Sequence, residues 1–289
     1  MLNLRQFGFV ALWSPFFFLF VVLISFLFFY LAIKKRSLFP GKEPLSVKES
    51  VGFLFAMLLL YIVKGSPVDL LSHLMFTFHM IQMAILNLII PPLLIVFVPD
   101  WLWERLLSFR IIRGLFHFFT RPVVALLFFN GMFSFYHIPF IFDFMKTDFF
   151  YHTGFTLLLF IAAFFMWWPL INTVEKKQLS GLQKALYLVA DSVLITPACA
   201  LIIFSPEAFY ETYTNAELWL QSLTLCVPVG TLAQLNLGGP ELFNLLPAHV
   251  DQQAGGVAMK LMQEFIYLTV LYRSIKAWFR QEQEKKLPT

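Results

Sequence analysis

Charged residues are scarce in this chain. Asp, Glu, Lys and Arg make up 13% of its 289 residues, whereas 59% are hydrophobic. A soluble domain carries about 25% charged residues, so this chain has too few to cover a surface that faces water. The shortage excludes a soluble globular protein and predicts a protein that lies in a membrane.

Cysteine is also rare, and the familiar catalytic and nucleotide-binding signatures are missing. The two cysteines, Cys199 and Cys226, form no CxxC pair and no disulfide framework. The sequence contains no Walker A, GxGxxG or HExxH motif, and it suggests no Ser–His–Asp arrangement. We therefore expect neither enzymatic activity nor nucleic-acid binding, and the net charge of +4 is explained below by basic residues at helix ends.

Phenylalanine is abundant instead. The chain has 37 Phe, many of them in runs such as residues 16–18. These runs follow neither a helical nor a strand period, which is typical of helices that are apolar all round and face lipid. Strands of a membrane barrel would alternate apolar and polar residues. The fold class that we predict is all-α, a polytopic bundle of membrane helices.

Seven segments are apolar enough to be membrane helices within a single membrane domain. The second is short against the ~20 residues that a spanning helix needs. The predicted helices cover residues 9–33, 50–63, 71–98, 122–136, 149–171, 182–204 and 255–278.

The basic residues give the orientation. Of the 21 Lys and Arg, 17 fall in residues 34–49, 100–121, 172–184 and the tail from 273. These regions are alternate loops plus the C-terminus, and basic loops stay in the cytoplasm. We therefore predict an outer N-terminus and a cytoplasmic C-terminus.

Residues 205–249 then form an outer loop. Its apolar part, 216–237, is an alternative eighth span, but an eighth span would place the basic tail outside, so we favour a helix that caps the bundle.

Five of the six histidines fall in the outer half of this topology. Ionisable groups at membrane depth are costly and often mark functional sites. Met75, His79 and Met83 follow one another at intervals of four residues, so a helix would place them on one face. Imidazole and thioether ligands together suit Cu(I), although methionine is also a common packing residue. The outer histidines are His73, His79, His137, His152 and His249.

Further polar residues lie near these positions. Asp251 either caps the last predicted helix or orients a liganding histidine, and Gln82 adds an amide beside His79. Asp191 lies inside the sixth predicted helix, where pairing with Lys184, solvation or a proton path are the alternatives. For the cysteines, packing as small apolar residues is the default, with copper thiolates or a disulfide as alternatives.

Several stretches, in this order, resemble the CtaG family, the membrane assembly factors of caa3-type cytochrome c oxidase in Gram-positive bacteria. The resemblance covers roughly residues 65–280. One position departs from it, because many members have a second histidine where this chain has Met83. The matching stretches are HMIQM at 79–83, PPLL at 91–94, HIP at 137–139, WWPL at 167–170 and DQQAGG at 251–256.

The resemblance implies a role in maturing the oxidase, in the bacterial cytoplasmic membrane. The implied partners are oxidase subunits or other assembly factors, together with the lipid bilayer. We hypothesise an outward-facing Cu(I) site that serves a copper centre of the oxidase, with His79 and Met83 as its first ligands. A metal-free scaffold for oxidase subunits is the main alternative, and a transporter of copper or a small molecule is the second. The further candidate ligands are His73, Met75, His137, His152 and His249.

Overall fold

A computed structural model describes residues 4–36, 43–174, 178–235 and 237–286. Over these residues all regular structure is helical, with no strand, so the predicted all-α membrane bundle is confirmed. The α-helices are α1 (Gly8–Trp13), α2 (Pro15–Phe29), α3 (Val47–Gly65), α4 (Pro67–Leu74), α5 (Phe76–Ala84), α6 (Ile90–Phe97), α7 (Asp100–Leu106), α8 (Arg110–Phe119), α9 (Pro122–Tyr136), α10 (Pro139–Lys146), α11 (Phe149–Ile171), α12 (Gly181–Phe204), α13 (Ala216–Leu223), α14 (Val229–Gln234) and α15 (Ala248–Lys286).

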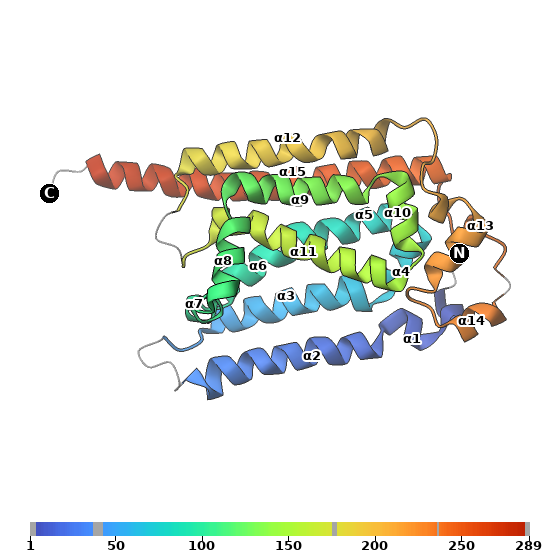
Figure 1. Cartoon of the computed structure of the whole chain (residues 1–289), viewed down its shortest axis with the longest axis horizontal. Helices are drawn as coiled ribbons and strands as arrows, with labels where there is room; N and C mark the ends of the chain where they lie inside the picture. Colours follow the sequence, from blue (N-terminus) through green and yellow to red (C-terminus); the bar gives the residue numbers. More distant parts are fainter. Residues whose placement is uncertain (1–3, 37–42, 175–177, 236, 287–289) are drawn as a thin grey trace.

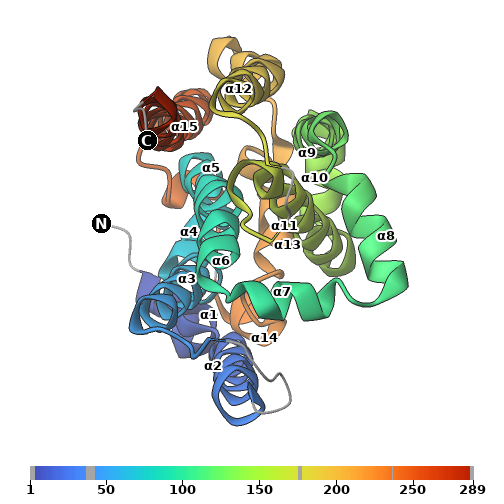
Figure 2. The ribbon, with the colours of Figure 1, turned by 90° about the vertical axis from the view of Figure 1, so that its left-hand side faces the viewer.

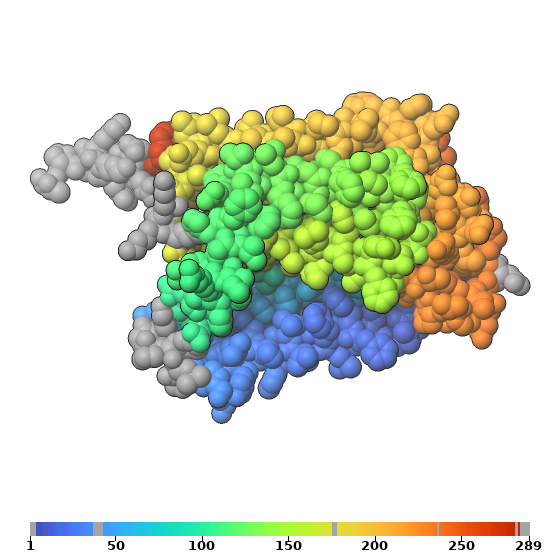
Figure 3. Space-filling model, in the orientation of Figure 1, coloured from blue at the N-terminus to red at the C-terminus, as the bar shows by residue number. Residues whose placement is uncertain are grey.

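The long helices run side by side along the longest axis of the molecule, and short helices lie at its two ends (Figure 1). We call the end with α10, α13 and α14 the α10 end, and the end with α7 and α8 the α8 end. Viewed along the bundle, α11 lies near the middle, whereas α2 and α12 lie at opposite sides (Figure 2). In the space-filling view the segment after α12 covers the α10 end (Figure 3).

Four helical stretches of the described chain are long and apolar enough to cross a membrane. Two bent pairs could each form one more span: α3 with α4, bent by 44°, and α8 with α9, bent by 79°. The structure therefore offers four to six candidate spans, and the predicted count of seven and the predicted orientation remain predictions. The four stretches are Leu4–Lys34, Phe76–Phe97, Phe149–Ile171 and Gly181–Phe204.

The seventh predicted helix, 255–278, lies within α15 but is not among these candidates. It carries two charged residues, Lys260 and Glu264, that form hydrogen bonds with side chains of α12. Lys260 Nζ lies 2.8 Å from Glu264 Oε1 and 3.0 Å from Thr196 Oγ1, and Ser192 Oγ donates to Glu264 Oε1 at 2.6 Å. A polar seam thus joins α12 and α15.

The short second predicted helix, 50–63, is longer in the structure because α3 begins at Val47 and ends at Gly65. Ser46 and Glu49 form a capping box at its start: Ser46 Oγ accepts from Glu49 N at 3.1 Å, and Ser46 N donates to Glu49 Oε2 at 2.7 Å. Three lysines that support the predicted orientation, Lys42, Lys176 and Lys177, lie outside the described residues.

The third predicted helix, 71–98, is broken in the structure. Met75 is extended, with φ −136° and ψ 135°, and it separates α4 from α5. A turn of π-helix, Ile85–Ile89, then joins α5 to α6. Pro91 and Pro92 follow in the first turn of α6, and because proline lacks a backbone N–H, the regular ladder cannot continue through them.

The segment 205–249 forms a cap rather than an eighth span. Its helices α13 and α14 have 8 and 6 residues, far fewer than the ~20 that cross a bilayer. Trp219 and Phe243 of this segment pack with Phe7, Leu70 and other buried apolar residues from the first helices of the chain. The cap therefore closes the α10 end of the bundle.

Two glycines let α15 approach its neighbours. A Cβ on Gly255 would lie 2.8 Å from Phe76 Cδ1 and 3.2 Å from the Phe76 carbonyl oxygen, and one on Gly256 would lie 2.7 Å from Ile203 Cγ1. Small residues at such contacts allow helix backbones to pack closely in membranes. Gly255 thus fixes the distance between α15 and α5.

We predict that Gly255→Val destabilises the protein, because the added side chain forces α15 away from Phe76. Overpacking of this kind costs about 1–3 kcal/mol, measured as a lower midpoint of thermal unfolding in detergent. Gly131→Val is the matched control, since it places the same side chain in a helix, α9, where a Cβ meets nothing within 4 Å. Equal losses in the two variants would contradict the proposed role of Gly255.

Candidate functional site: a buried histidine cluster

Four of the five candidate histidines come together at the α10 end. His73 lies on α4, His79 on α5, His137 directly after α9, and His152 in the first turn of α11. All four are buried, with at most 8% of the residue's surface exposed. The ring centroids of His79 and His137 are 6.0 Å apart, and those of His73 and His152 are 5.7 Å apart. The cluster thus consists of two pairs.

Three ring nitrogens of the cluster have no hydrogen-bond partner in the described part of the chain. They are His73 Nδ1, His79 Nε2 and His137 Nε2. His137 Nδ1 lies 2.8 Å from the Phe133 carbonyl oxygen. Because a carbonyl only accepts, Nδ1 must carry the proton, which leaves a lone pair on Nε2 of a neutral ring. Burial lowers the pKa of His137 to about 4, against the opposing effect of this hydrogen bond, so the ring is neutral at pH 7.

Aromatic rings cover the His79–His137 pair. Phe142 of α10 meets the His79 ring edge to face at 5.1 Å. Tyr210, from the segment after α12, packs on Phe142 with ring centroids 4.4 Å apart. The Tyr210 hydroxyl donates to the His137 carbonyl oxygen at 2.9 Å. The cap therefore shields this part of the site from water, and Tyr210 joins it to His137 by a hydrogen bond. In the other pair, the Tyr136 hydroxyl lies 3.3 Å from His152 Nδ1.

Lys146, at the end of α10, is a functional candidate that the sequence reasoning missed. Its side chain is fully buried, and Nζ donates to the Ser72 carbonyl oxygen at 3.0 Å and to the Tyr213 hydroxyl. The ammonium also lies over the Tyr213 ring, 4.1 Å from its centroid. One signal could have found it: Lys146 is the only Lys or Arg between residues 122 and 175.

The two methionines proposed with His79 are in different surroundings. Met83 packs in the main core of the bundle. Met75 is the residue at the break before α5, and it packs in the cap with Leu70 and Trp219. The predicted continuous stripe of Met75, His79 and Met83 is therefore interrupted at its first member.

Asp251 and Gln82 bind backbone rather than histidines. The Asp251 carboxylate accepts from Phe76 N at 2.6 Å and from Thr77 N at 3.3 Å, so it caps α5 rather than its own helix. Gln82 Nε2 donates to the Val63 carbonyl oxygen at 2.5 Å and to Asp69 Oδ1 at 2.8 Å. Both residues hold the helices that carry the site.

The remaining candidates lie apart from the cluster. His249 is exposed at the start of α15. Asp191 is buried among α9, α12 and α15, where it accepts hydrogen bonds from Asn130 and Tyr267 rather than pairing with Lys184. Cys199 and Cys226 are both free thiols, so they form no disulfide with each other. Across the described residues, no group of three or more His, Cys, Asp or Glu is placed to hold a metal ion.

The buried Lys146 predicts a pH dependence of stability. Burial lowers its pKa from 10.5 to about 7 in the folded protein. As the pH drops from about 10.5 to about 7, Lys146 becomes protonated in the unfolded chain but not in the folded protein. The free energy of unfolding therefore falls over this range and does not change further below about pH 7. We expect the protein to be more stable at pH 9 than at pH 7, by at most about 2 kcal/mol from this group.

Lys146→Met should remove this difference between the two pH values, measured by thermal unfolding in detergent. The Ser72 carbonyl keeps a donor in the variant, because the Tyr213 hydroxyl also bonds it at 2.6 Å. Lys48→Met, which replaces an exposed lysine of α3, should leave the difference unchanged. A pH profile of Lys146→Met that follows the unaltered protein would show that the buried amine does not titrate in this range.

The chain matches the model of a known protein family. The model of the cytochrome c oxidase caa3 assembly factor family matches residues 25–281, which include every helix that carries the histidine cluster. No curated protein and no solved structure matches the chain. Because the family model covers most of the chain, this membrane protein belongs to the caa3 cytochrome c oxidase assembly factor family.

Proposed function

We propose that this protein assists the maturation of a copper centre of the caa3-type oxidase by holding Cu(I) between His79 and His137. The observation that carries the proposal is the pair of Nε2 atoms that face no hydrogen-bond partner although both rings are buried. A buried polar atom without a partner costs about 1–3 kcal/mol, and a bound metal ion would offset that cost.

The spacing of the rings supports the proposal. Two imidazoles that bind one ion through nitrogens about 2.0 Å from it have ring centroids roughly 5–6.5 Å apart. The His79–His137 distance of 6.0 Å lies in this range. The tautomer of His137 supports it as well, since a metal-ligating histidine commonly donates its other N–H to a carbonyl, as His137 does to Phe133.

The surroundings favour a monovalent, soft ion. A single positive charge costs less to bury among Phe142, Tyr210 and the other aromatic rings than a double charge does. Cu(I) accepts imidazole and thioether ligands and low coordination numbers, so two histidines suffice. Met83, one helical turn beyond His79 on α5, provides a third, thioether donor in the same part of the core.

The second pair, His73 and His152, offers the copper ion a second binding position. His152 lines a cavity of about 390 Å³ among α2, α3, α6 and α11. His137 lines a different cavity, of about 530 Å³, between α9 and α12. One histidine of each pair thus lines a cavity of its own.

Metal analysis tests the proposal directly. The purified protein is loaded with Cu(I) under reducing conditions, and we expect His79→Ala and His137→Ala each to lower the affinity by at least about tenfold. The matched control is His117→Ala, since His117 is an exposed histidine of α8 at the other end of the bundle. Oxidase activity in cells that carry each variant should follow the copper affinity. Full copper binding in both site variants would refute a copper site at this pair.

The same variants separate a copper carrier from a metal-free scaffold. A carrier that has lost its copper site still binds oxidase subunits but leaves the oxidase inactive. A scaffold with no metal keeps both subunit binding and oxidase activity after His79→Ala. Co-purification with the oxidase, measured beside its activity, therefore decides between the two functions.

A further inference from the structure

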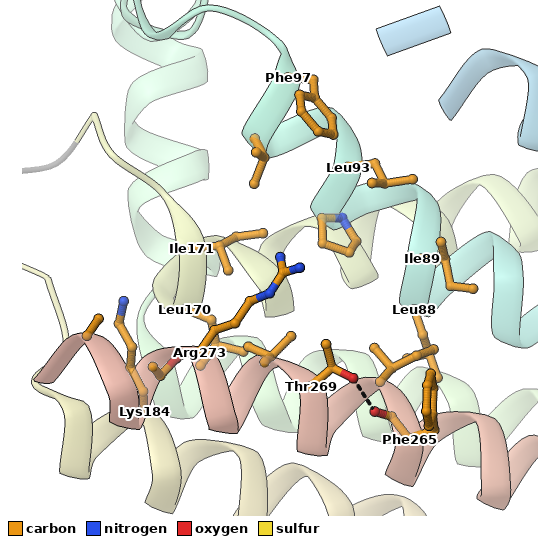
Figure 4. Close-up of a pocket in the computed structure, with 16 residues that line it drawn as sticks. Leu88, Ile89, Leu93, Phe97, Leu170, Ile171, Lys184, Phe265, Thr269 and Arg273 are labelled. Carbon is orange, nitrogen blue, oxygen red and sulfur yellow. Dashed lines mark hydrogen bonds between the residues drawn. The ribbon is translucent and has the colours of Figure 1, made fainter. Parts of the chain in front are cut away.

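An apolar groove lies away from the histidine cluster, between α6 and α15. Its volume is about 570 Å³, within the range of ligand sites in proteins. The walls come from Leu93 and Phe97 of α6 and from Phe265 and Val270 of α15, and the end of α11 forms its floor. The hydroxyl of Thr269 donates its proton to the Phe265 carbonyl oxygen at 2.9 Å, so it has no proton left to donate to a ligand (Figure 4).

Two cations belong to the lining of this groove. Arg273 reaches from α15 into the groove beside Ile171, and Lys184 lies at the edge of the groove (Figure 4). No carboxylate lines the groove, and none in the described part of the chain pairs with either cation. The groove therefore combines an apolar wall with unpaired positive charge near one end.

We propose that this groove binds an anionic phospholipid, with the lipid phosphate between Arg273 and Lys184 and an acyl chain along α6 and α15. Arg273 is eight positions after Phe265 on α15, which is about 12 Å of helix for the acyl chain to follow. Phe265 is 75% exposed and Val96 52% exposed, so the groove is open on the outer surface of the bundle.

The position of the groove agrees with this ligand. Lys184 lies in the first turn of α12, near the basic segments that the charge pattern predicts to be cytoplasmic. Basic pockets between membrane helices on that side bind anionic headgroups. Arginine presents a planar fork that matches two phosphate oxygens, and lysine adds a second charge. A neutral apolar ligand would leave both cations unused.

Lipid titration of the purified full-length protein tests the proposal. Binding of phosphatidylglycerol and of phosphatidylcholine with the same acyl chains is followed by native mass spectrometry in detergent. We expect a clear preference for phosphatidylglycerol. Arg273→Gln and Lys184→Gln should each weaken phosphatidylglycerol binding by about fivefold, and the double variant by about 25-fold.

The matched control is Lys276→Gln, one turn further along α15. Lys276 lies over the Tyr272 ring, 5.7 Å from its centroid, and does not line the groove. The same loss of charge at Lys276 should leave lipid binding unchanged. Leu93→Trp, which fills the groove and keeps both cations, should also abolish the preference, and unfolding midpoints report whether each variant is folded.

Three results would overturn the proposal. Equal binding of the two lipids would show that the headgroup is not recognised. Displacement of phosphatidylglycerol by glycerol phosphate, which has no acyl chain, would show a site for soluble phosphate. If the double variant binds lipid normally but no longer co-purifies with an oxidase subunit, the groove is a surface for a protein partner.

Discussion

The carboxylate of Asp251 accepts hydrogen bonds from the backbone N–H groups of Phe76 and Thr77, and the histidine site depends on this contact. Inside a membrane every backbone polar group must be bonded within the protein. The break at Met75 leaves the first N–H groups of α5 without helical partners, and a residue 175 positions away supplies the acceptor. α5 can therefore begin inside the bundle, with His79 one turn from its start.

The same contact positions the rest of the site. Thr77 Oγ1 donates to the Asp251 carbonyl oxygen at 2.9 Å, and Gly255 allows α15 to lie against Phe76. The next residue after Asp251, Gln252, accepts from Phe209 N at 2.7 Å and so holds the segment that leads to Tyr210. The start of α15 thus fixes both the helix that carries His79 and the cap that covers it.

Local features were readable from the sequence, and contacts between distant segments were not. Hydropathy and charge predicted a helical membrane protein because both depend on composition along one segment. Spacing placed His79 and Met83 on one helix for the same reason. The break at Met75 has no proline or glycine to mark it, so the sequence predicted an unbroken helix there. The cap that Asp251 provides from α15 compensates for the break, and no local pattern contains that contact.

For the residues of the site too, local features were predictable from the sequence, and contacts between distant segments were not. That His73, His137 and His152 fall in one half of the bundle follows from the predicted topology, but their pairing follows from how α4, α9 and α11 pack. His249 shares that half and is exposed nevertheless. Lys146 is a lysine in an apolar segment, and only the fold brings the Ser72 carbonyl and the Tyr213 hydroxyl to its ammonium.

Several polar groups near the unpartnered nitrogens of His79 and His137 are bonded to distant segments of the chain. At the α10 end, Asp251, Gln82 and Lys146 each have bonds to backbone atoms across distant segments. Around His79 and His137, Phe142 offers neither a donor nor an acceptor, and the nearby hydroxyls of Tyr210 and Tyr136 contact the His137 carbonyl oxygen and His152 instead. Buried polar groups that lack partners are rare and expected mainly where they serve a function. A soft cation between two neutral imidazoles supplies the bond that each Nε2 lacks, which is why we place the copper between these two rings, with Met83 as an additional donor.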